Sequence, residues 1–273
     1  MSVPKIVFIV PYRNRKSEKN NFSNIMNDLL EDYDKNDYEI YYSCQKDYDG
    51  RPFNRGAIKN IGFLTIKKKY PNDYKNITFV FNDVDTYPSK KNMLPFETEK
   101  NIIKHFYGFT YALGGIFSIK GEDFEKLNGF PNNWGWGFED NEINRRANEK
   151  NITIDRSVFF PIKSKEIIQL IDNPLRLISN KEPANYIKHK MNDDLNTINN
   201  LNYNIESNII EAKNFVNQYN INIESFNTLI PHNSGLFYSQ NLSENSKINS
   251  NKFKRIVNNR FRMAVNMGEI NKK

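Results

Sequence analysis

Residues 76–88 read NITFVFNDVDTYP, a short apolar run that ends in two aspartates one residue apart. The aromatic and β-branched residues before Asn82 predict a strand. Residues two apart on an extended segment point the same way, so Asp83 and Asp85 can face one ligand. Carboxylate oxygens suit Mg²⁺ or Mn²⁺, which typically bind phosphate oxygens as well. The alternative for so short a pattern is a strand-end turn with two solvated acids.

Strand and helix alternate in the segments that precede this stretch. Residues 5–15, KIVFIVPYRNR, begin with a β-branched run that predicts a buried parallel strand, and 17–33 have helical spacing. YEIYYSCQ at 38–45 predicts a second strand, and FNRGAIKNIGFLTIKKKY at 53–70 predicts a helix. Such alternation is typical of an α/β sandwich with a mainly parallel sheet, which binds ligands at the carboxyl ends of its strands.

The second half of the chain carries weaker signals. We expect helices at 123–127, 140–149 and 208–219, a loop at 129–137, and strands at 152–160 and 220–226. From residue 227 the chain becomes polar and then basic, with the potential to form an amphipathic helix. The sequence therefore predicts one domain at 1–226 and an extension at 227–273.

Composition excludes several classes of protein. Aromatic residues make up 14% of the 273 residues, enough to build a core, so wholesale disorder is excluded. The net charge is +7, but the lysines are scattered, so no specific nucleic-acid contact is predicted; binding through the basic tail is the alternative. The single Cys44 excludes an internal disulfide. The apolar run at 6–10 is too short to span a bilayer, so we expect a cytoplasmic protein without a membrane anchor, or a fragment that has lost one.

The segment NWGWGFEDNE at 133–142 holds both tryptophans of the chain. The glycines on either side of Trp136 let the backbone bend, and its ring offers a flat face for a sugar. Glu139 and Asp140 follow at a predicted helix N-terminus, where the helix dipole favours carboxylates. The segment predicts a lid over a sugar site. The alternative is that both tryptophans fill the core.

Two basic loops fall at expected strand and helix ends. PYRNR at 11–15 places two arginines after the first strand, and Phe53 and Arg55 precede the second helix. Guanidinium groups can pair with phosphates in a bidentate manner. The alternative for each loop is an ordinary basic surface.

Taken in order, these motifs resemble the β-1,4-galactosyltransferase family, which includes the xylosylprotein galactosyltransferase branch. The resemblance covers residues 5–146 and rests on PYRNR, PFNRGAIKNIGF, NDVDTYP, GGIFSIKGEDFEKLNGFPN and WGWGFEDNE. It implies a GT-A type α/β fold, with a mainly parallel central sheet flanked by helices. It also implies an inverting enzyme that depends on Mn²⁺ or Mg²⁺. Such an enzyme moves Gal or GalNAc from a UDP-sugar to a glycan or glycoconjugate.

The resemblance also implies residue roles. Asp140 would be the general base, Glu139 a sugar contact beside it, and Asp85 a metal ligand. Asp172 and His189 are candidates for the later metal ligands. The residues expected around the UDP-sugar and the acceptor are Pro11, Tyr12, Arg13, Arg15, Phe53, Arg55, Asp83, Val84, Ala112, Gly114, Gly115, Trp136 and Asn141.

Three positions depart from the family. Phe138 stands where a glycine or arginine is common, and Asn141 stands where a second aspartate holds the acceptor. Ala112 replaces a tyrosine, and a smaller residue there makes room for an N-acetyl group, so we expect UDP-GalNAc to be used at least as well as UDP-Gal. The alternative to an enzyme is an inactive protein of the same fold that binds a UDP-sugar or a glycan.

Overall fold

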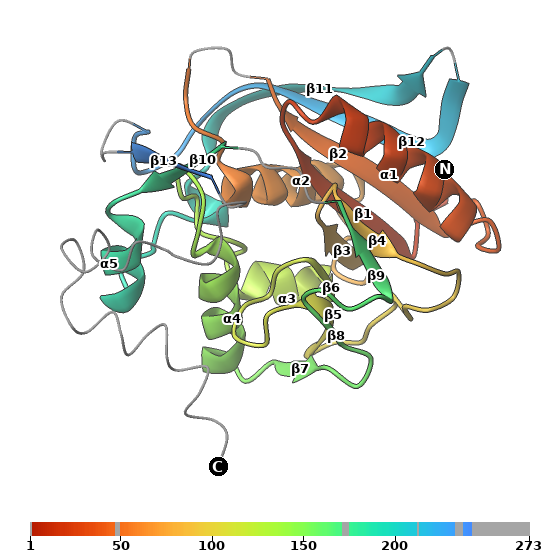
Figure 1. The fold of residues 1–273 in the computed structure, drawn as a ribbon, viewed down its shortest axis with the longest axis horizontal. Helices are drawn as coiled ribbons and strands as arrows, with labels where there is room; N and C mark the ends of the chain where they lie inside the picture. The colour runs from red at the N-terminus through yellow and green to blue at the C-terminus, as the bar shows by residue number, and fades with distance from the viewer. Residues whose placement is uncertain (1, 47–49, 171–174, 212, 233–236, 242–273) are drawn as a thin grey trace.

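The central sheet is mixed but mostly parallel, in agreement with the prediction. The computed structural model describes residues 2–46, 50–170, 175–211, 213–232 and 237–241. These residues form a nine-stranded sheet in the order β11-β12-β2-β1-β3-β6-β5-β7, with β8 paired to β5 (Figure 1). Its strands are β1 (Ile6–Tyr12), β2 (Tyr38–Gln45), β3 (Thr78–Asn82), β5 (Ile102–Gly108), β6 (Ile116–Lys120), β7 (Thr153–Asp155), β8 (Phe160–Pro161), β11 (Asn199–Ile210) and β12 (Lys213–Asn227). Strands β12, β2, β1 and β3 run parallel, whereas β6 is antiparallel to both its neighbours.

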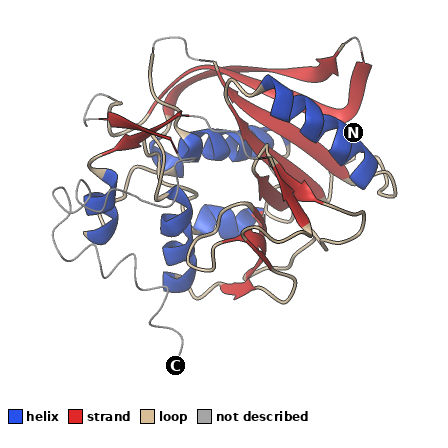
Figure 2. Ribbon diagram, in the orientation of Figure 1, coloured by secondary structure: helices blue, strands red, loops and turns tan. Residues whose placement is uncertain are grey.

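Helices cover both faces of this sheet (Figure 2). Side chains of α1 pack into the hydrophobic cluster on one face, and those of α2, α3 and α4 pack into the cluster on the other. The helices are α1 (Lys16–Leu29), α2 (Arg55–Lys69), α3 (Gly121–Lys126), α4 (Glu139–Glu149), α5 (Glu182–Ile187) and the short 3₁₀ helix η1 (Leu195–Thr197). Within the described ranges, none is both long and apolar enough to cross a bilayer.

Strand β1 shows why its apolar run is uninterrupted. Ile6, Phe8 and Val10 belong to the cluster that includes α1, while Val7 and Ile9 belong to the cluster that includes α2. All five side chains are buried. Successive residues of a strand point to opposite faces, so a strand covered on both sides needs apolar residues at every position.

Two small sheets lie outside the central one. β4 (Thr86–Pro88) pairs antiparallel with β9 (Ile167–Gln169), and β10 (Leu175–Ser179) pairs antiparallel with β13 (Phe237–Asn241). Both bring late parts of the chain to early ones: β9 lies beside the segment that follows Asp85, and β10 lies beside the Trp-Gly loop.

The predicted helix at 208–219 is wrong. Strands β11 and β12 instead form a long antiparallel hairpin, and β12 adds in parallel to the edge of β2 (Figure 1). The Tyr219 ring stacks on Tyr41 of β2 with centroids 5.1 Å apart, and Ile221 and Ile223 are buried. This burial, made with a strand almost two hundred residues away, outweighs local helix propensity. The predicted strand at 220–226 lies inside β12 and is confirmed.

Two further boundaries differ from the prediction. The strand expected at 152–160 is split into β7 and β8, which both pair in parallel with β5. The predicted division after residue 226 falls at the end of β12, and β13 from the expected extension packs back onto β10. The helix expected in the basic tail lies outside the described residues.

A buried histidine supports the loop between β5 and β6. His105 Nε2 lies 3.0 Å from the Tyr107 carbonyl oxygen and 3.2 Å from that of Gly114. Since both partners are acceptors, Nε2 carries the proton, and Nδ1 accepts a hydrogen bond from Arg156 Nε at 3.1 Å. Burial and the charge of Arg156 together lower the pKa of His105 to about 4.

This buried histidine predicts a loss of stability in mild acid. The folded protein keeps His105 neutral down to about pH 4, whereas the unfolded chain binds a proton near its ordinary value of 6.5. The unfolded state therefore binds more protons in this window, and stability falls with pH from about 6.5 to about 4. We expect His105 to account for a loss on the order of 2 kcal/mol between pH 7 and pH 5.

Urea unfolding at both pH values measures this loss. In His105→Gln the difference between pH 7 and pH 5 should shrink by that amount, while the exposed-site control His189→Gln should keep the wild-type difference. An undiminished difference in His105→Gln would contradict the assignment.

Candidate active site

Arg55 joins three segments at one edge of the sheet. It is the first residue of α2, and Asn54 before it caps the helix by accepting from the Ala57 amide at 2.9 Å. The Arg55 guanidinium pairs with Asp83, which directly follows β3. Its Nη1 also lies 2.7 Å from Glu139 Oε1 and 3.2 Å from Asp140 Oδ2, the first two residues of α4. The predicted site residues Arg55, Asp83, Glu139 and Asp140 therefore form one cluster.

Asp140 is held by two cations. Lys59, one turn after Arg55 on α2, places Nζ 2.8 Å from Asp140 Oδ1. Burial raises the pKa of Asp140, but the charges of Lys59 and Arg55 outweigh that effect and hold the pKa below its ordinary range. Asp140 is therefore ionised at neutral pH and able to accept a proton.

The two glycines after β5 let the backbone enter this cluster. Leu113 donates its amide hydrogen to the Asp140 carbonyl oxygen at 2.9 Å, and the Asp83 amide donates to the Gly115 carbonyl oxygen at 3.1 Å. A Cβ on Gly114 would stand 2.7 Å from Asp140 Oδ2. Gly115 has φ +69°, and a Cβ there would collide with the Tyr107 carbonyl oxygen. The loop thus lies between the two carboxylates only because neither residue carries a side chain.

Asp85 lies buried beside the cluster. Its Oδ2 accepts from Arg15 Nη1 at 2.8 Å, and its Oδ1 accepts from Thr86 Oγ1 at 2.9 Å. The Leu170 amide donates to the Asp85 carbonyl oxygen at 2.8 Å, so the chain reaches Asp85 just before residue 171. Asp172 itself lies outside the described residues. Within the described residues, no group of three His, Cys, Asp or Glu side chains is arranged to hold a metal.

His189, the other candidate metal ligand, lies elsewhere. Its side chain is 65% exposed, and its nearest charged partner is Glu149, at 3.8 Å. Glu149 is the last residue of α4 and Glu139 the first, so the two are about 15 Å apart along the helix axis. The described contacts therefore do not bring His189 to Asp85.

The two tryptophans have different roles. The Trp134 ring is buried and stacks on Phe226 with centroids 5.4 Å apart, and its Nε1 donates to Thr228 Oγ1 and the Ile230 carbonyl oxygen. Trp136 is 37% exposed, and its amide donates to the Leu177 carbonyl oxygen at 2.7 Å. The alternative that the tryptophans fill the core thus holds for Trp134. Trp136 instead lies partly exposed at the surface.

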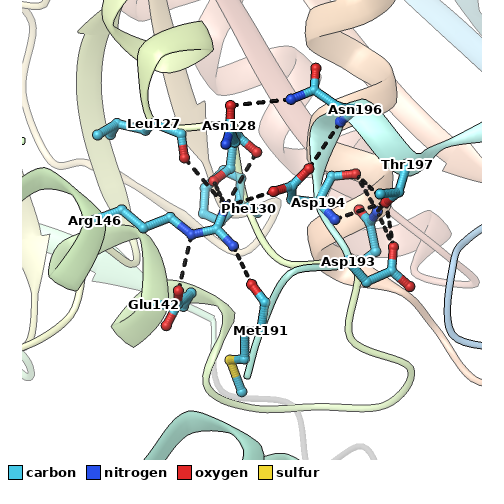
Figure 3. Close-up of polar contacts among 12 residues, drawn as sticks. Leu127, Asn128, Phe130, Glu142, Arg146, Met191, Asp193, Asp194, Asn196 and Thr197 are labelled. Atoms are coloured by element: carbon cyan, nitrogen blue, oxygen red, sulfur yellow. Dashed lines mark hydrogen bonds and ion pairs between the residues drawn. The ribbon is translucent and has the colours of Figure 1, made fainter. Parts of the chain in front are cut away.

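A network on the far side of α4 fixes the helix in place (Figure 3). Arg146 pairs with Glu142 at 3.0 Å within the helix and donates to the Met191 carbonyl oxygen at 2.6 Å and the Gly129 carbonyl oxygen at 3.0 Å. These bonds join α4 to the loop before it and to the segment after α5. Because both neighbours are held, Glu139 and Asp140 keep their position at the helix start.

The remaining predicted residues are placed by their elements and by contacts outside the cluster. Arg13 Nη1 donates to the Arg51 carbonyl oxygen at 2.7 Å, and the Phe53 carbonyl oxygen accepts from the Gly135 amide at 3.3 Å. Asn141 lies in the first turn of α4. The others are Pro11 and Tyr12 at the end of β1, and the buried Val84 and Ala112.

Sequence reasoning missed Lys59, Arg176 and an aromatic pair. Lys59 lies one turn after Arg55 on α2, and the helical spacing of the two was the only local signal that could have marked it. Arg176 lies with its guanidinium carbon 5.4 Å from the Trp136 ring, and no local motif identifies it. The Phe109 and Tyr111 rings stack 5.2 Å apart in the loop before the glycines, and both are exposed. Exposed stacked rings offer a face for a sugar.

The chain is similar to known glycosyltransferases. Residues 1–95 match the N-terminal region of glycosyl transferase group 7, and residues 99–168 match the N-terminal domain of galactosyltransferase. β-1,4-Galactosyltransferase 1 of Mus musculus is 33% identical over 165 residues, 57% of this chain and 40% of that protein. β-1,4-Galactosyltransferase 5 of Mus musculus is 27% identical over 208 residues, 73% of this chain and 51% of that protein. The chain thus spans about half or less of these relatives.

Among solved structures, the catalytic domain of Drosophila β-1,4-galactosyltransferase 7 in complex with xylobiose superposes with a TM-score of 0.63 at 22% identity. The match covers 81% of this chain and 94% of that one. It confirms the GT-A type fold, with its mixed, mostly parallel central sheet.

Proposed function

The chain belongs to the β-1,4-galactosyltransferase family, and from this premise we propose that it is an inverting hexosyltransferase that uses a UDP-sugar. In this proposal the acceptor is a sugar hydroxyl of a glycan or glycoconjugate, and Asp140 is the general base. The observation that carries the proposal is the cluster of Asp83, Glu139 and Asp140 around Arg55 at the glycine loop.

The transfer step follows from the chemistry of Asp140. An acceptor hydroxyl is a poor nucleophile, so a base must take its proton as the oxygen attacks the anomeric carbon. The bond from that carbon to the diphosphate oxygen breaks, UDP departs with the electron pair, and the proton moves to Asp140. A single displacement of this kind inverts the anomeric centre and needs one base. Asp140 is suited to it because its two cationic partners keep it charged.

Cationic side chains suit the departing diphosphate. Arg15 after β1 and Arg55 at the start of α2 each pair with an aspartate of the Asp-x-Asp turn. Arg176 is a third arginine close to the same aspartates, whose charges act on it. Guanidinium groups can pair with phosphate through two parallel hydrogen bonds. We therefore assign this side of the cluster to the donor diphosphate.

The residues around Asp85 fit a divalent cation. Asp85 offers a buried carboxylate, the hard oxygen donor that Mn²⁺ and Mg²⁺ prefer. We propose that Asp85 holds the ion and that Asp172, which follows Leu170 closely in the chain, is a better candidate than His189 for a further ligand. When bound, such an ion neutralises negative charge on the leaving UDP.

The loop before Gly114 and Gly115 is suited to bind the acceptor sugar and to select the donor sugar. Phe109 and Tyr111 expose stacked rings, and the Phe138 ring contacts Tyr186 with centroids 5.2 Å apart at the start of α4. Ala112 lies between the aromatic pair and the Leu113 bond to Asp140. We propose that its small side chain leaves room for a donor N-acetyl group, so that UDP-GalNAc serves at least as well as UDP-Gal. Because xylobiose is bound by a solved relative, xylosides belong in the acceptor panel.

Loss of the base should abolish transfer. Asp140→Asn cannot accept the proton, so we expect turnover to fall by at least about 10²-fold, the usual contribution of a general base. UDP affinity should change little, because the amide keeps the carboxylate's shape. UDP release with a panel of donors and acceptors measures turnover, and calorimetry measures UDP binding. The exposed-site variant Asp28→Asn serves as the control. Normal turnover in Asp140→Asn would exclude Asp140 as the base.

Donor choice should depend on residue 112. In Ala112→Tyr we expect kcat/KM for UDP-GalNAc to fall at least about tenfold relative to UDP-Gal, because pocket shape readily rejects a larger substrate. Ala112→Ser keeps a small side chain and should retain both activities. A wild-type protein that strongly prefers UDP-Gal over UDP-GalNAc would refute this proposal.

The proposed metal ligands can be ranked by binding. Asp85→Asn and Asp172→Ala should each weaken Mn²⁺-dependent binding of UDP by about tenfold or more, as expected when an ion loses a charged oxygen ligand. His189→Ala should bind as the wild type does, because its imidazole lies beside the far end of α4. Calorimetric titration of UDP with Mn²⁺ or with a chelator provides the comparison. An equal loss of Mn²⁺-dependent UDP binding in His189→Ala would show that His189 is a metal ligand.

A further inference from the structure

We propose that Lys59 is a positioning residue for the base. It binds Oδ1 of Asp140, so that Oδ2 receives the proton of the acceptor hydroxyl. It also keeps the carboxylate charged when Arg55 binds the phosphates of the donor. This inference rests on the proposed function, because it concerns the base of that reaction. It assigns a role to a lysine that lies within the PFNRGAIKNIGF segment but was not among the predicted site residues.

The burial of Lys59 requires a compensating partner. Its side chain is 2% exposed, one turn from the start of α2, between buried residues. A buried ammonium group is costly unless it is paired and hydrogen-bonded. Lys59 Nζ lies 2.8 Å from Asp140 Oδ1 and 4.2 Å from the centre of the Phe130 ring, which attracts the cation. An apolar residue would fill the same space at a lower cost in free energy. The lysine is therefore best explained by the effect of its charge on Asp140.

The two oxygens of Asp140 face different surroundings. Oδ1 points to the buried Lys59, whereas Oδ2 lies 3.2 Å from Arg55 and close to the backbone of Gly114. Because Gly114 has no side chain, its backbone can lie close to Oδ2, the oxygen that is not bound to Lys59. Rotation of the carboxylate would break the bond to Lys59. The lysine therefore selects Oδ2 as the proton acceptor.

Lys59 and Arg55 differ in how many carboxylates they pair with. Arg55 is shared among Asp83, Glu139 and Asp140. Among the described residues, the ion pair of Lys59 is with Asp140 alone. An anionic donor can draw Arg55 toward its phosphates, but it cannot reach a lysine that is buried behind the carboxylate. Lys59 thus remains as the counter-ion of Asp140 through the reaction.

The other charged groups near Asp140 do not replace this effect. Glu139 on α4 and Asp83 after β3 are negative and already pair with Arg55. His105 on β5 stays neutral, because burial and the charge of Arg156 lower its pKa to about 4. Removal of Lys59 would therefore leave Asp140 buried beside two carboxylates with one shared cation, and its pKa would rise.

The test is the pH profile of Lys59→Met, which keeps the volume and removes the charge. The acidic limb of kcat should move to higher pH by about 1 unit or more, since a nearby opposite charge shifts a carboxylate by that much. The plateau above the limb should stay within a few-fold of the wild type, because a base freed from its counter-ion is stronger. Lys67→Met, on the same helix but paired with Glu125, is the matched control and should leave the profile unchanged. An unmoved limb in a folded Lys59→Met protein would overturn the proposal.

A second measurement needs no turnover. The carboxyl carbon signal of Asp140, identified by its loss in Asp140→Asn, can be titrated by NMR in wild type and Lys59→Met. The midpoint should rise in the variant, and an unchanged midpoint overturns the inference whether or not the protein transfers sugar. A wild type that releases no UDP with any donor would instead refute the proposed function. If thermal melts show that Lys59→Met does not fold, Lys59→Gln takes its place, since its amide can still donate to Oδ1 without the charge.

Discussion

The ion pairs of Arg55 are the interaction on which the rest of the site depends. Its guanidinium bridges the end of β3 and the start of α4, from a position at the start of α2. In the part of the chain that the structure describes, the ion pairs of Arg55 are with these three carboxylates, and Asp140 is paired with Lys59 as well. Three segments far apart in the sequence must therefore come together for the buried charge of Arg55 to be fully paired. This mutual dependence places the acids beside the glycine loop, where the donor and acceptor would meet.

The surrounding structure is arranged to keep that geometry. Helix α2 starts with a side-chain cap, and Asn60 on its inner face donates to the Phe130 carbonyl oxygen at 2.8 Å, which ties the helix to the loop before Trp134. Arg146 ties the other side of α4 to the segment after α5. Site residues are thus carried by the ends of regular elements, and a second layer of hydrogen bonds fixes those elements. Trp136 is the exception, since it stands on a glycine-flanked loop and its ring is partly exposed.

Local patterns predicted the parts of the fold that local physics controls. Strand β1 is apolar at every position because both faces are covered, and α2 has helical spacing because one side faces the sheet. Of the hairpin of β11 and β12, only the part at 220–226 was predicted. Leu201, Tyr203 and Ile205 alternate with polar residues, as is typical of a strand, but pairing of β12 with β2 is a long-range contact that no local pattern contains. Similarly, the Trp-Gly segment is conspicuous, but nothing in it tells which tryptophan ring enters the core. Stacking on Phe226 of β12 decides that it is Trp134.

The sequence by itself determined the family, the order of its motifs and the residue types of the site: the Asp-x-Asp turn, the paired glycines, the acids after the lid tryptophan and the arginines at strand ends. These depend on neighbouring residues, so they can be read along the chain. Only the tertiary structure decided that Lys59 faces Asp140, that Arg176 lies over Trp136 and that His189 stands apart from the cluster. Each of these is a contact between residues separated by many positions. The side that a lysine or histidine faces is set by the packing of whole elements, which no local pattern encodes.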